Sequence, residues 1–261
     1  MKTLPFIKMH GLGNDYIYID CFNKTTSEII SKIDLPALAQ AVSDRHFGIG
    51  SDGLVLIIPS SEADARMRIF NADGSEAEMC GNAIRCVGKY LYESGLCHDV
   101  HMEIETLAGT RVLSLKIAHK QVEQVTVNMG RPVIQPESIQ VGMDPMGYTS
   151  VNMGNPHAVF FHDELPALPA NTNIEFVHVR NKKELDVRVI ERGSGETLAC
   201  GTGACAAAVA AIYHGLTERT VTVHLPGGEL SIQWSTASSP VFMTGPATEV
   251  FRGEYKWEDQ Q

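Results

Sequence analysis

Two cysteines, Cys80 and Cys200, have matching neighbours and are the residues best suited to carry out chemistry. Each is followed directly by glycine and preceded four residues earlier by glutamate, in "EAEMCGN" and "ETLACGT". The two segments align without a gap at a separation of 120 residues, as do Arg68 and Arg188 upstream. A repeat of this length covers a whole domain, so it indicates duplication rather than a solenoid of short units.

A thiol at the first position of a helix is a candidate acid or base. The unpaired N–H groups and the positive end of the helix dipole favour thiolate there, so we expect thiolate to be favoured at both cysteines. Glycines behind each thiol (Gly81, Gly201) leave the backbone amides open to an anion such as a carboxylate. The alternative is that both thiols are small core residues, which is common for free cysteine, but their matched positions argue against it.

These thiols must be positioned by two helices of different character. Between Gly81 and Ser94 an apolar stripe alternates with polar residues, which predicts a helix with one partly wet face. Residues 201–214 are apolar all round, so that helix must be enclosed by strands. Gly95 and Gly215 are expected to end the two helices at positive φ.

The predicted fold class is α+β, with two pseudo-symmetric lobes that each wrap a curved, mostly antiparallel sheet or barrel around a central helix. The N-terminal lobe is expected at 1–131 with 247–261 packed back on it, and the C-terminal lobe at 132–246. The Pro- and Gly-rich stretch 129–147 is the predicted linker, and a further helix is expected at 35–45 with Pro36 in its first turn. Strands are predicted from short β-branched and aromatic runs at 6–9, 16–20, 54–58, 66–70, 100–106, 111–117, 122–127, 149–153, 158–161, 174–179, 186–190, 220–224, 230–234 and 241–243.

Composition excludes several function classes. The net charge of −10 argues against nucleic-acid binding, so a small-molecule partner is expected. No signal peptide or membrane span is expected, which predicts a cytoplasmic protein whose six cysteines are reduced. No metal site is expected, because Cys97, His98 and His101 find nothing elsewhere to complete a zinc centre. "GLGND" and "GTGACA" lack the residues of nucleotide-binding loops.

Asparagine recurs beside glycine, in "GND", "CGN" and "MGNPH". Each occurrence alone is typical of a turn, but together with the loops before the two cysteines they indicate segments that converge on one cleft. Asparagine offers a donor and an acceptor without charge, and Arg192 offers a bidentate fork for a carboxylate. This inventory suits a zwitterionic ligand.

With these residues in place, the chain resembles the diaminopimelate epimerase family from end to end. The matching segments are "KMHGLGNDY", "NADGSEAEMCGN", "MGNPHAV", "NTNIEF", "ERGSGETLACGTGACA" and "MTGPATEVF". The resemblance implies the two-lobed fold and interconversion of LL- and meso-diaminopimelate, in lysine and peptidoglycan precursor biosynthesis, without pyridoxal phosphate or metal. The oligomeric state stays open, with a homodimer as the candidate assembly.

The resemblance also implies roles for individual residues. Cys80 and Cys200 correspond to the paired acid and base, and His157 and Glu191 to groups that tune the thiols. The residues implied to hold substrate are Asn14, Asn71, Gly81, Asn82, Asn155, Asn173, Glu191, Arg192, Gly201 and Thr202. Gly53 stands where some family members have a substrate-contacting glutamine, so that contact is not carried over, and trimmed loops are expected in the second lobe.

Two alternatives remain at this level. A racemase of another amino acid, of the histidine or proline and hydroxyproline type, would keep the fold and the two bases. Proline-type relatives usually show histidine after the first Cys-Gly, where this chain has Asn82. An alternative of another class is a redox-sensing protein that uses Cys80 and Cys200 as a switchable disulfide.

Overall fold

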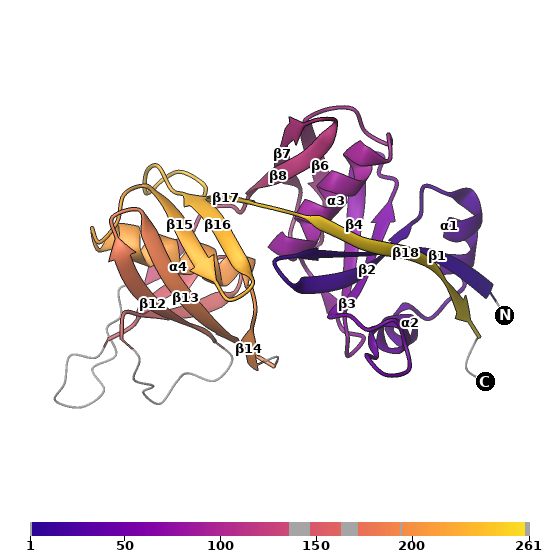
Figure 1. Ribbon diagram of the computed structural model, residues 1–261, viewed down its shortest axis with the longest axis horizontal. Helices are drawn as coiled ribbons and strands as arrows, with labels where there is room; N and C mark the ends of the chain where they lie inside the picture. Colours follow the sequence, from indigo (N-terminus) through magenta and orange to yellow (C-terminus); the bar gives the residue numbers. More distant parts are fainter. Residues whose placement is uncertain (1, 136–146, 163–171, 194, 259–261) are drawn as a thin grey trace. The chain divides into compact units, whose positions relative to one another are not determined.

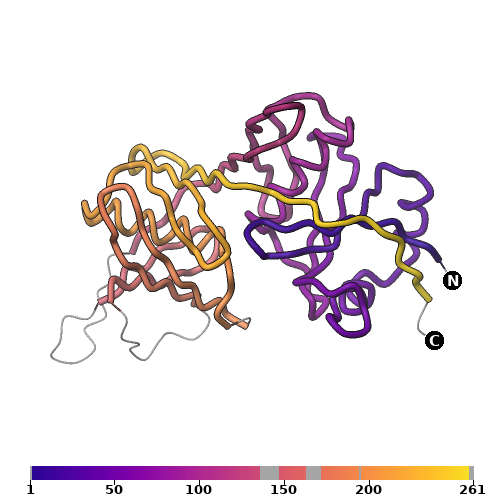
Figure 2. Tube along the Cα trace, viewed as in Figure 1, coloured from indigo at the N-terminus to yellow at the C-terminus, as the bar shows by residue number. Residues whose placement is uncertain are grey.

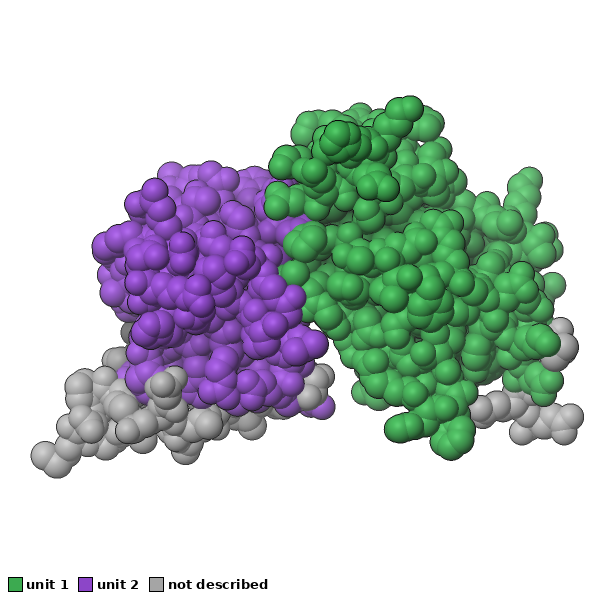
Figure 3. Space-filling view, in the orientation of Figure 1, with its two compact units in different colours: residues 1–125, 246–261 green, residues 126–245 purple. Residues whose placement is uncertain are grey.

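The computed structural model describes residues 2–135, 147–162, 172–193 and 195–258, which form two compact units (Figure 3). Unit 1 comprises Met1–Val125 and Pro246–Gln261, and unit 2 comprises Thr126–Gly245. Of the expected linker at 129–147, residues 136–146 lie outside the described part. Among the described residues, no helix is long and apolar enough to cross a membrane.

Unit 1 is a mixed sheet with three helices (Figure 1). Its elements are β1 (Lys2–Gly11), β2 (Asn14–Asp20), α1 (Lys24–Ile30), α2 (Leu35–Ser43), β3 (Gly53–Ile58), β4 (Ala65–Asn71), β5 (Glu76–Ala77), α3 (Gly81–Glu93), β6 (His101–Glu105), β7 (Arg111–Ala118), β8 (Gln121–Asn128, whose end from Thr126 belongs to unit 2) and β18 (Thr248–Trp257). The C-terminal strand β18 pairs antiparallel with β1, so the two ends of the chain run side by side in this unit (Figure 2).

The described residues of unit 2 form strands around one helix, α4. Its elements are β9 (Val133–Gln135), β10 (Thr149–Asn152), β11 (Pro156–Phe160), β12 (Asn173–Asn181), β13 (Glu184–Glu191), β14 (Gly195–Thr197), α4 (Gly201–Tyr213), β15 (Thr220–Leu225), β16 (Gly228–Gln233) and β17 (Phe242–Gly245).

Strand pairing shows that the two units share one topology. In unit 1, β2 pairs parallel with β3, β3 antiparallel with β4, and β4 parallel with β6. In unit 2, β11 pairs parallel with β12, β12 antiparallel with β13, and β13 parallel with β15. The predicted fold class is therefore confirmed, with the refinement that parallel pairs occur among the antiparallel ones in the described part of both units.

The two central helices differ as their sequences predicted. Every residue of α4 from Gly203 to Ile212 is buried, and the helix packs against β10, β11, β12, β13, β15 and β16. The helix α3 keeps Lys89, Tyr92 and Glu93 partly or fully exposed. Both end as predicted: Gly95 and Gly215 have φ of 74° and 69°, and the next residue's N–H bonds back to the carbonyl five positions earlier.

Some elements lack a signal that a periodicity analysis can use. The helix α1 was not predicted; it is short and mixed in polarity, and it begins at an Asn23 side chain that accepts from the Thr26 N–H. The strands β5 and β14, of two and three residues, are too short for an alternating pattern. The helix α2 begins at Leu35 as predicted and ends at Ser43.

Candidate active site

Cys80 is the N-terminal cap of α3, with φ −136° and ψ 121°. Its thiol donates to Asn14 Oδ1 at 3.5 Å, and Asn82 Nδ2 donates to the same oxygen at 3.2 Å. Asn14 is the first residue of β2, so the turn between β1 and β2 places it over the start of the helix. Three of the predicted site residues, Cys80, Asn14 and Asn82, are thus in direct contact.

Asn14 is fixed by a chain of charged residues that the sequence analysis missed. Asn14 Nδ2 donates to Asp52 Oδ2 at 2.8 Å, and Arg45 bridges Asp52 and Asp15 at 2.9 and 2.8 Å. Lys8 pairs with Asp15 at 2.8 Å. Burial raises the pKa of Asp15, but the Arg45 and Lys8 bonds outweigh it and leave that pKa below its usual value. The orientation of Asn14 is therefore held by ionised groups on β1, β2 and the segment after α2.

Tyr16 and Asn71 lie on either side of Gly53 in adjacent strands. Tyr16 is 6% exposed, and burial together with the nearby Cys80 and Asp52 raises its pKa well above the usual value. A Cβ on Gly53 would lie 2.1 Å from the Phe70 carbonyl oxygen, so only glycine fits there. Asn71 donates to Ser75 Oγ at 3.0 Å within the turn after β4.

Among the described residues, Arg85 is the largest side chain that is fully buried. It contacts the first turn of α3, the helix that Cys80 caps. Its guanidinium donates to the carbonyls of Gly81 and Pro246, each at 3.1 Å. A Cβ on Gly11 would lie 2.7 Å from Arg85 NH2, so β1 passes directly over the guanidinium. Arg85 thus joins the first turn of α3 to β1 and to the segment that leads into β18.

Cys200 caps α4 in the equivalent position, with φ −117° and ψ 116°. The Gly203 N–H donates to its sulfur at 3.4 Å, and Thr202 Oγ1 lies 3.5 Å from the sulfur. The bond from the Gly203 N–H lowers the pKa of Cys200, as expected for a helix start, but other effects outweigh it. Its burial, and then the negative charge of Glu191, raise its pKa well above the usual value despite the bonds from Thr202 and Gly203.

Glu191 and Asn173 lie opposite each other at the end of the β12–β13 ladder, one residue beyond the Ile174–Ile190 pair. Glu191 Oε1 accepts from Thr197 Oγ1 at 2.6 Å. Asn173 is 8% exposed, and its Oδ1 accepts from the backbone N–H of Arg192 at 2.9 Å. Asn173 therefore fixes the backbone of Arg192, whose side chain is exposed.

His157 is fully buried and joins two residues through its two ring nitrogens. Nδ1 lies 2.6 Å from Glu175 Oε1, and Nε2 lies 2.9 Å from Asn155 Oδ1. Glu175 is also fully buried, and burial raises its pKa. Sequence reasoning placed His157 and Asn155 at the site but missed Glu175, although a glutamate inside the apolar run "NIEFV" was a usable signal.

The shared topology aligns the site residues of the two units. Tyr16 pairs with Gly53 across β2 and β3 as His157 pairs with Asn173 across β11 and β12. Asn14 and Asn155 each precede that position by two residues.

The four backbone positions predicted to meet a carboxylate, Gly81, Asn82, Gly201 and Thr202, form the first turns of α3 and α4. An N-terminal helix turn directs N–H groups outward, so each turn is a candidate carboxylate site.

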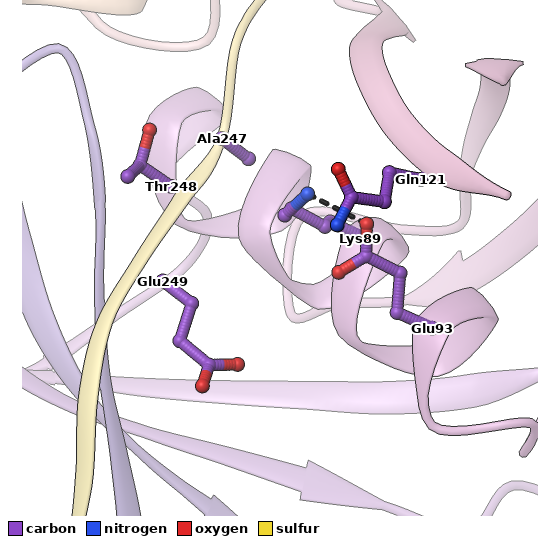
Figure 4. Close-up of a pocket in the computed structure, with 6 residues that line it drawn as sticks. All are labelled: Lys89, Glu93, Gln121, Ala247, Thr248 and Glu249. Carbon is purple, nitrogen blue, oxygen red and sulfur yellow. Dashed lines mark hydrogen bonds and ion pairs between the residues drawn. The ribbon is translucent and has the colours of Figure 1, made fainter. Parts of the chain in front are cut away.

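A pocket of about 440 Å³ lies elsewhere on unit 1, lined by Lys89, Glu93, Gln121, Ala247, Thr248 and Glu249 (Figure 4). Lys89 already pairs with Glu93 at 2.6 Å and donates to the Val122 carbonyl. It lies nine residues after Cys80, about 13 Å along the helix axis. The pocket is therefore separate from the thiol.

Known proteins match this chain over nearly its whole length. The family model described as diaminopimelate epimerase matches residues 6–135 and 149–250. The chain is 48% identical to a diaminopimelate epimerase of Acetivibrio thermocellus, over 96% of this chain and 98% of that one. It is 47% identical to one of Methanococcus maripaludis, over 96% and 99%.

Solved structures show the same fold at low identity. A phenazine biosynthesis protein of the PhzF family from Bacillus anthracis has a TM-score of 0.74 at 17% identity, covering 98% of this chain and 100% of that one. A hydroxyproline epimerase from Agrobacterium vitis has a TM-score of 0.68 at 14% identity, covering 97% and 92%. At these identities the likeness establishes the fold alone.

Proposed function

Because the chain belongs to the diaminopimelate epimerase family, we propose that Cys80 and Cys200 are the acid and base of its reaction. The chain is an isomerase, a diaminopimelate epimerase that interconverts the LL and meso forms. The reaction belongs to lysine and peptidoglycan precursor biosynthesis.

Inverting an α-carbon requires that one group remove a proton from one face and another deliver a proton to the opposite face. The observation that carries the proposal is that each unit caps its equivalent helix with one thiol. We take the two units as the lobes of the enzyme, close to the expected division at 131 and 246. In one direction the thiolate of one cysteine accepts the α-proton while the thiol of the other donates its own, and the roles reverse for the other isomer.

The carbanion formed at the α-carbon needs electrostatic stabilisation. In the proposal the N–H groups of the first turns of α3 and α4, at Gly81, Asn82, Gly201 and Thr202, bind the reacting carboxylate. The stabilisation comes from preorganised dipoles of the chain itself, and the proposal needs neither pyridoxal phosphate nor a metal ion.

The remaining side chains hold the substrate. Arg192 binds the distal carboxylate through its guanidinium fork, and the asparagines supply neutral donors and acceptors: Asn14, Asn71, Asn155 and Asn173. Glu191 contacts the substrate and, with His157, tunes the thiols. Support for the effect of Glu191 on a thiol comes from the raised pKa of Cys200, to which Glu191 contributes.

The proposed setting is the cytoplasm, with a homodimer as the assembly. Val250 and Phe251 on β18 are 51% and 44% exposed, and large exposed apolar side chains on a strand favour association. Light scattering coupled to size exclusion should give twice the chain mass, and a monomer at working concentration would refute the homodimer.

The test of the two-base proposal replaces each thiol separately. Cys80→Ala and Cys200→Ala should each abolish net epimerisation of LL-diaminopimelate, measured by chiral chromatography, with the circular dichroism spectrum unchanged. Retention of more than a few per cent of wild-type activity by either variant would exclude the two-thiol mechanism. The same assay with histidine, proline and hydroxyproline tests the substrate alternatives. If oxidation of the thiols abolishes epimerase activity and reductant restores it, the disulfide is an inactivated form of the enzyme rather than the working state of a redox sensor.

A further inference from the structure

Glu175 is a buried acid for which the proposed mechanism has no use. It lies in the middle of β12 at zero exposure, with Oε1 against His157 Nδ1 at 2.6 Å. Among the described residues, its second oxygen, Oε2, has no hydrogen-bond partner. A buried polar atom in this state costs free energy, so the residue requires an explanation beyond packing.

The duplicated half of the molecule shows that the fold does not require an acid here. Gly53 and Asn173 are equivalent, so the position two residues further along the strand is Val55 in unit 1 and Glu175 in unit 2. Both are fully buried. The neighbouring strand carries Tyr16 in unit 1 where unit 2 carries His157. The buried titratable pair is therefore specific to the unit that holds Cys200.

Glu175 also packs against the helix turn that Cys200 caps. A Cβ on Gly203 would lie 2.8 Å from Glu175 Oε1, so the carboxyl group occupies the space that glycine leaves. The N–H of this same Gly203 donates to the Cys200 sulfur. Glu175 thus contacts the first turn of α4 on one side and His157 on the other.

The contacts of His157 determine where its proton lies. Complete burial of both side chains favours a Glu175–His157 pair without net charge, and such a pair carries a hydrogen on Nε2, which then donates to Asn155 Oδ1 at 2.9 Å. The Nδ1–Oε1 contact then holds one shared proton, either on Glu175 as a neutral acid or on His157 as an imidazolium beside a carboxylate. Both arrangements leave the pair neutral overall, which suits complete burial.

We propose that Glu175 is a positioning residue that shares one proton with His157 and thereby turns the Asn155 side chain so that its NH2 group is the donor offered to the substrate. With Oδ1 held by Nε2–H, only Nδ2 of Asn155 can bond a carboxylate oxygen. This inference rests on the proposed substrate contact of Asn155. It extends the site from Asn155 through His157 to the turn below Cys200.

The first test uses the wild-type enzyme and does not depend on any variant. Nitrogen-15 NMR of histidine-labelled protein, with the His157 signal identified from its absence in His157→Gln, reports which ring nitrogens carry hydrogen. Nε2 should carry a hydrogen in the wild-type enzyme. A His157 ring whose Nε2 is unprotonated would overturn the proposal.

The second test compares two substitutions of similar volume. Glu175→Gln can donate its amide hydrogen to Nδ1 and should keep the protonated Nε2 and a KM near the wild-type value. Glu175→Leu cannot bond Nδ1, and Val55 shows that the equivalent strand accepts an apolar residue. It should raise KM for diaminopimelate about three- to tenfold, the effect of one lost hydrogen bond, with a smaller change in kcat.

A purely structural role would lower the melting temperature of Glu175→Leu without a selective rise in KM. If Glu175→Leu has wild-type kinetics, or if Glu175→Gln impairs KM as strongly as Leu does, the proposal is wrong. Failure of the two-thiol mechanism appears separately, as activity in Cys80→Ala or Cys200→Ala, so the two outcomes are distinguishable.

Discussion

At the scale of single residues, Cys200 shows how several opposed effects combine at one sulfur. The Gly203 N–H and Thr202 favour its thiolate, whereas burial and the carboxylate of Glu191 favour its thiol. Burial is the largest of these effects, so the helix start does not produce an acidic thiol. Cys200 is therefore expected to rest protonated at neutral pH, ready to donate.

Glu191→Gln should make Cys200 more reactive toward iodoacetamide. Glu191 is the largest charge effect that raises the Cys200 pKa, so its removal lowers that pKa. Below the pKa, each unit of decrease raises the thiolate fraction about tenfold, and the alkylation rate follows it. Peptide mapping across pH measures this rate.

Glu196→Gln is the matched control for Glu191→Gln. Glu196 is a half-exposed neighbour on β14 that pairs with Arg188, and it is not among the main causes of the raised Cys200 pKa. An unchanged or slower labelling of Cys200 in Glu191→Gln would contradict the electrostatic explanation.

Arg192→Lys should raise KM for diaminopimelate about tenfold, the effect of one charge-assisted hydrogen bond. The charge is kept, but an ammonium cannot make the two parallel bonds of a guanidinium with the distal carboxylate. Steady-state kinetics measures the effect, and a substrate lacking the distal carboxylate should be handled equally by both enzymes. Equal KM values for diaminopimelate would exclude the fork.

At the scale of elements, α3 and α4 begin and end in the same way but have different surroundings. Each begins at a cysteine cap and ends at a glycine of positive φ. The small side chains of α4 allow strands to approach it on all sides, whereas α3 relies on the buried Arg85 to join its first turn to β1 and to Pro246. Each thiol is thus presented by a helix whose two ends are fixed.

Gly215→Ala should lower the free energy of unfolding by about 1–2 kcal/mol, the cost of a left-handed conformation for a residue with a Cβ. Among the described residues nothing lies within 4 Å of the added Cβ, so backbone strain is the main contribution. Gly95→Ala is the matched test in unit 1 and should cost the same, since its Cβ makes only an ordinary 3.7 Å contact. Asparagine at either position should cost less. Urea denaturation that shows no loss for Gly215→Ala would contradict the strain argument.

At the scale of the whole molecule, duplication produced two units with one strand topology. The side chains at equivalent positions of the two units have since diverged in their chemistry. The asparagines Asn14 and Asn155 occupy equivalent positions, but Tyr16 and Val55 in unit 1 correspond to His157 and Glu175 in unit 2.

Epimerisation in D₂O should place deuterium at the inverted centre of the product from the first turnover. A thiolate that removes the α-proton cannot deliver a solvent deuteron to the other face, so the deuteron comes from the second thiol. Recovered substrate should stay largely protiated at early times, because the abstracting thiol exchanges slowly in a closed site. Early mass spectra with mostly unlabelled product would instead indicate a single base that serves both faces.

The sequence by itself determined the features that depend on neighbours along the chain. The matched segments around Cys80 and Cys200 located both helix starts, Gly95 and Gly215 located both ends, and the apolar run 201–214 required an enclosed helix. These follow from helical geometry, in which a residue meets others three and four positions away, so the printed order carries the information.

Only the tertiary structure decided the contacts that depend on strand register and on the return of the chain. Arg85 reaches the carbonyl of Pro246 across 161 positions, and Glu175 reaches His157 across 18 positions on a parallel neighbour. The rise in the Cys200 pKa also depends on the tertiary structure, because burial and the charge of Glu191 on β13 act through space. No local pattern encodes such effects, since a shift of one residue in register would turn each side chain to the opposite face of its sheet.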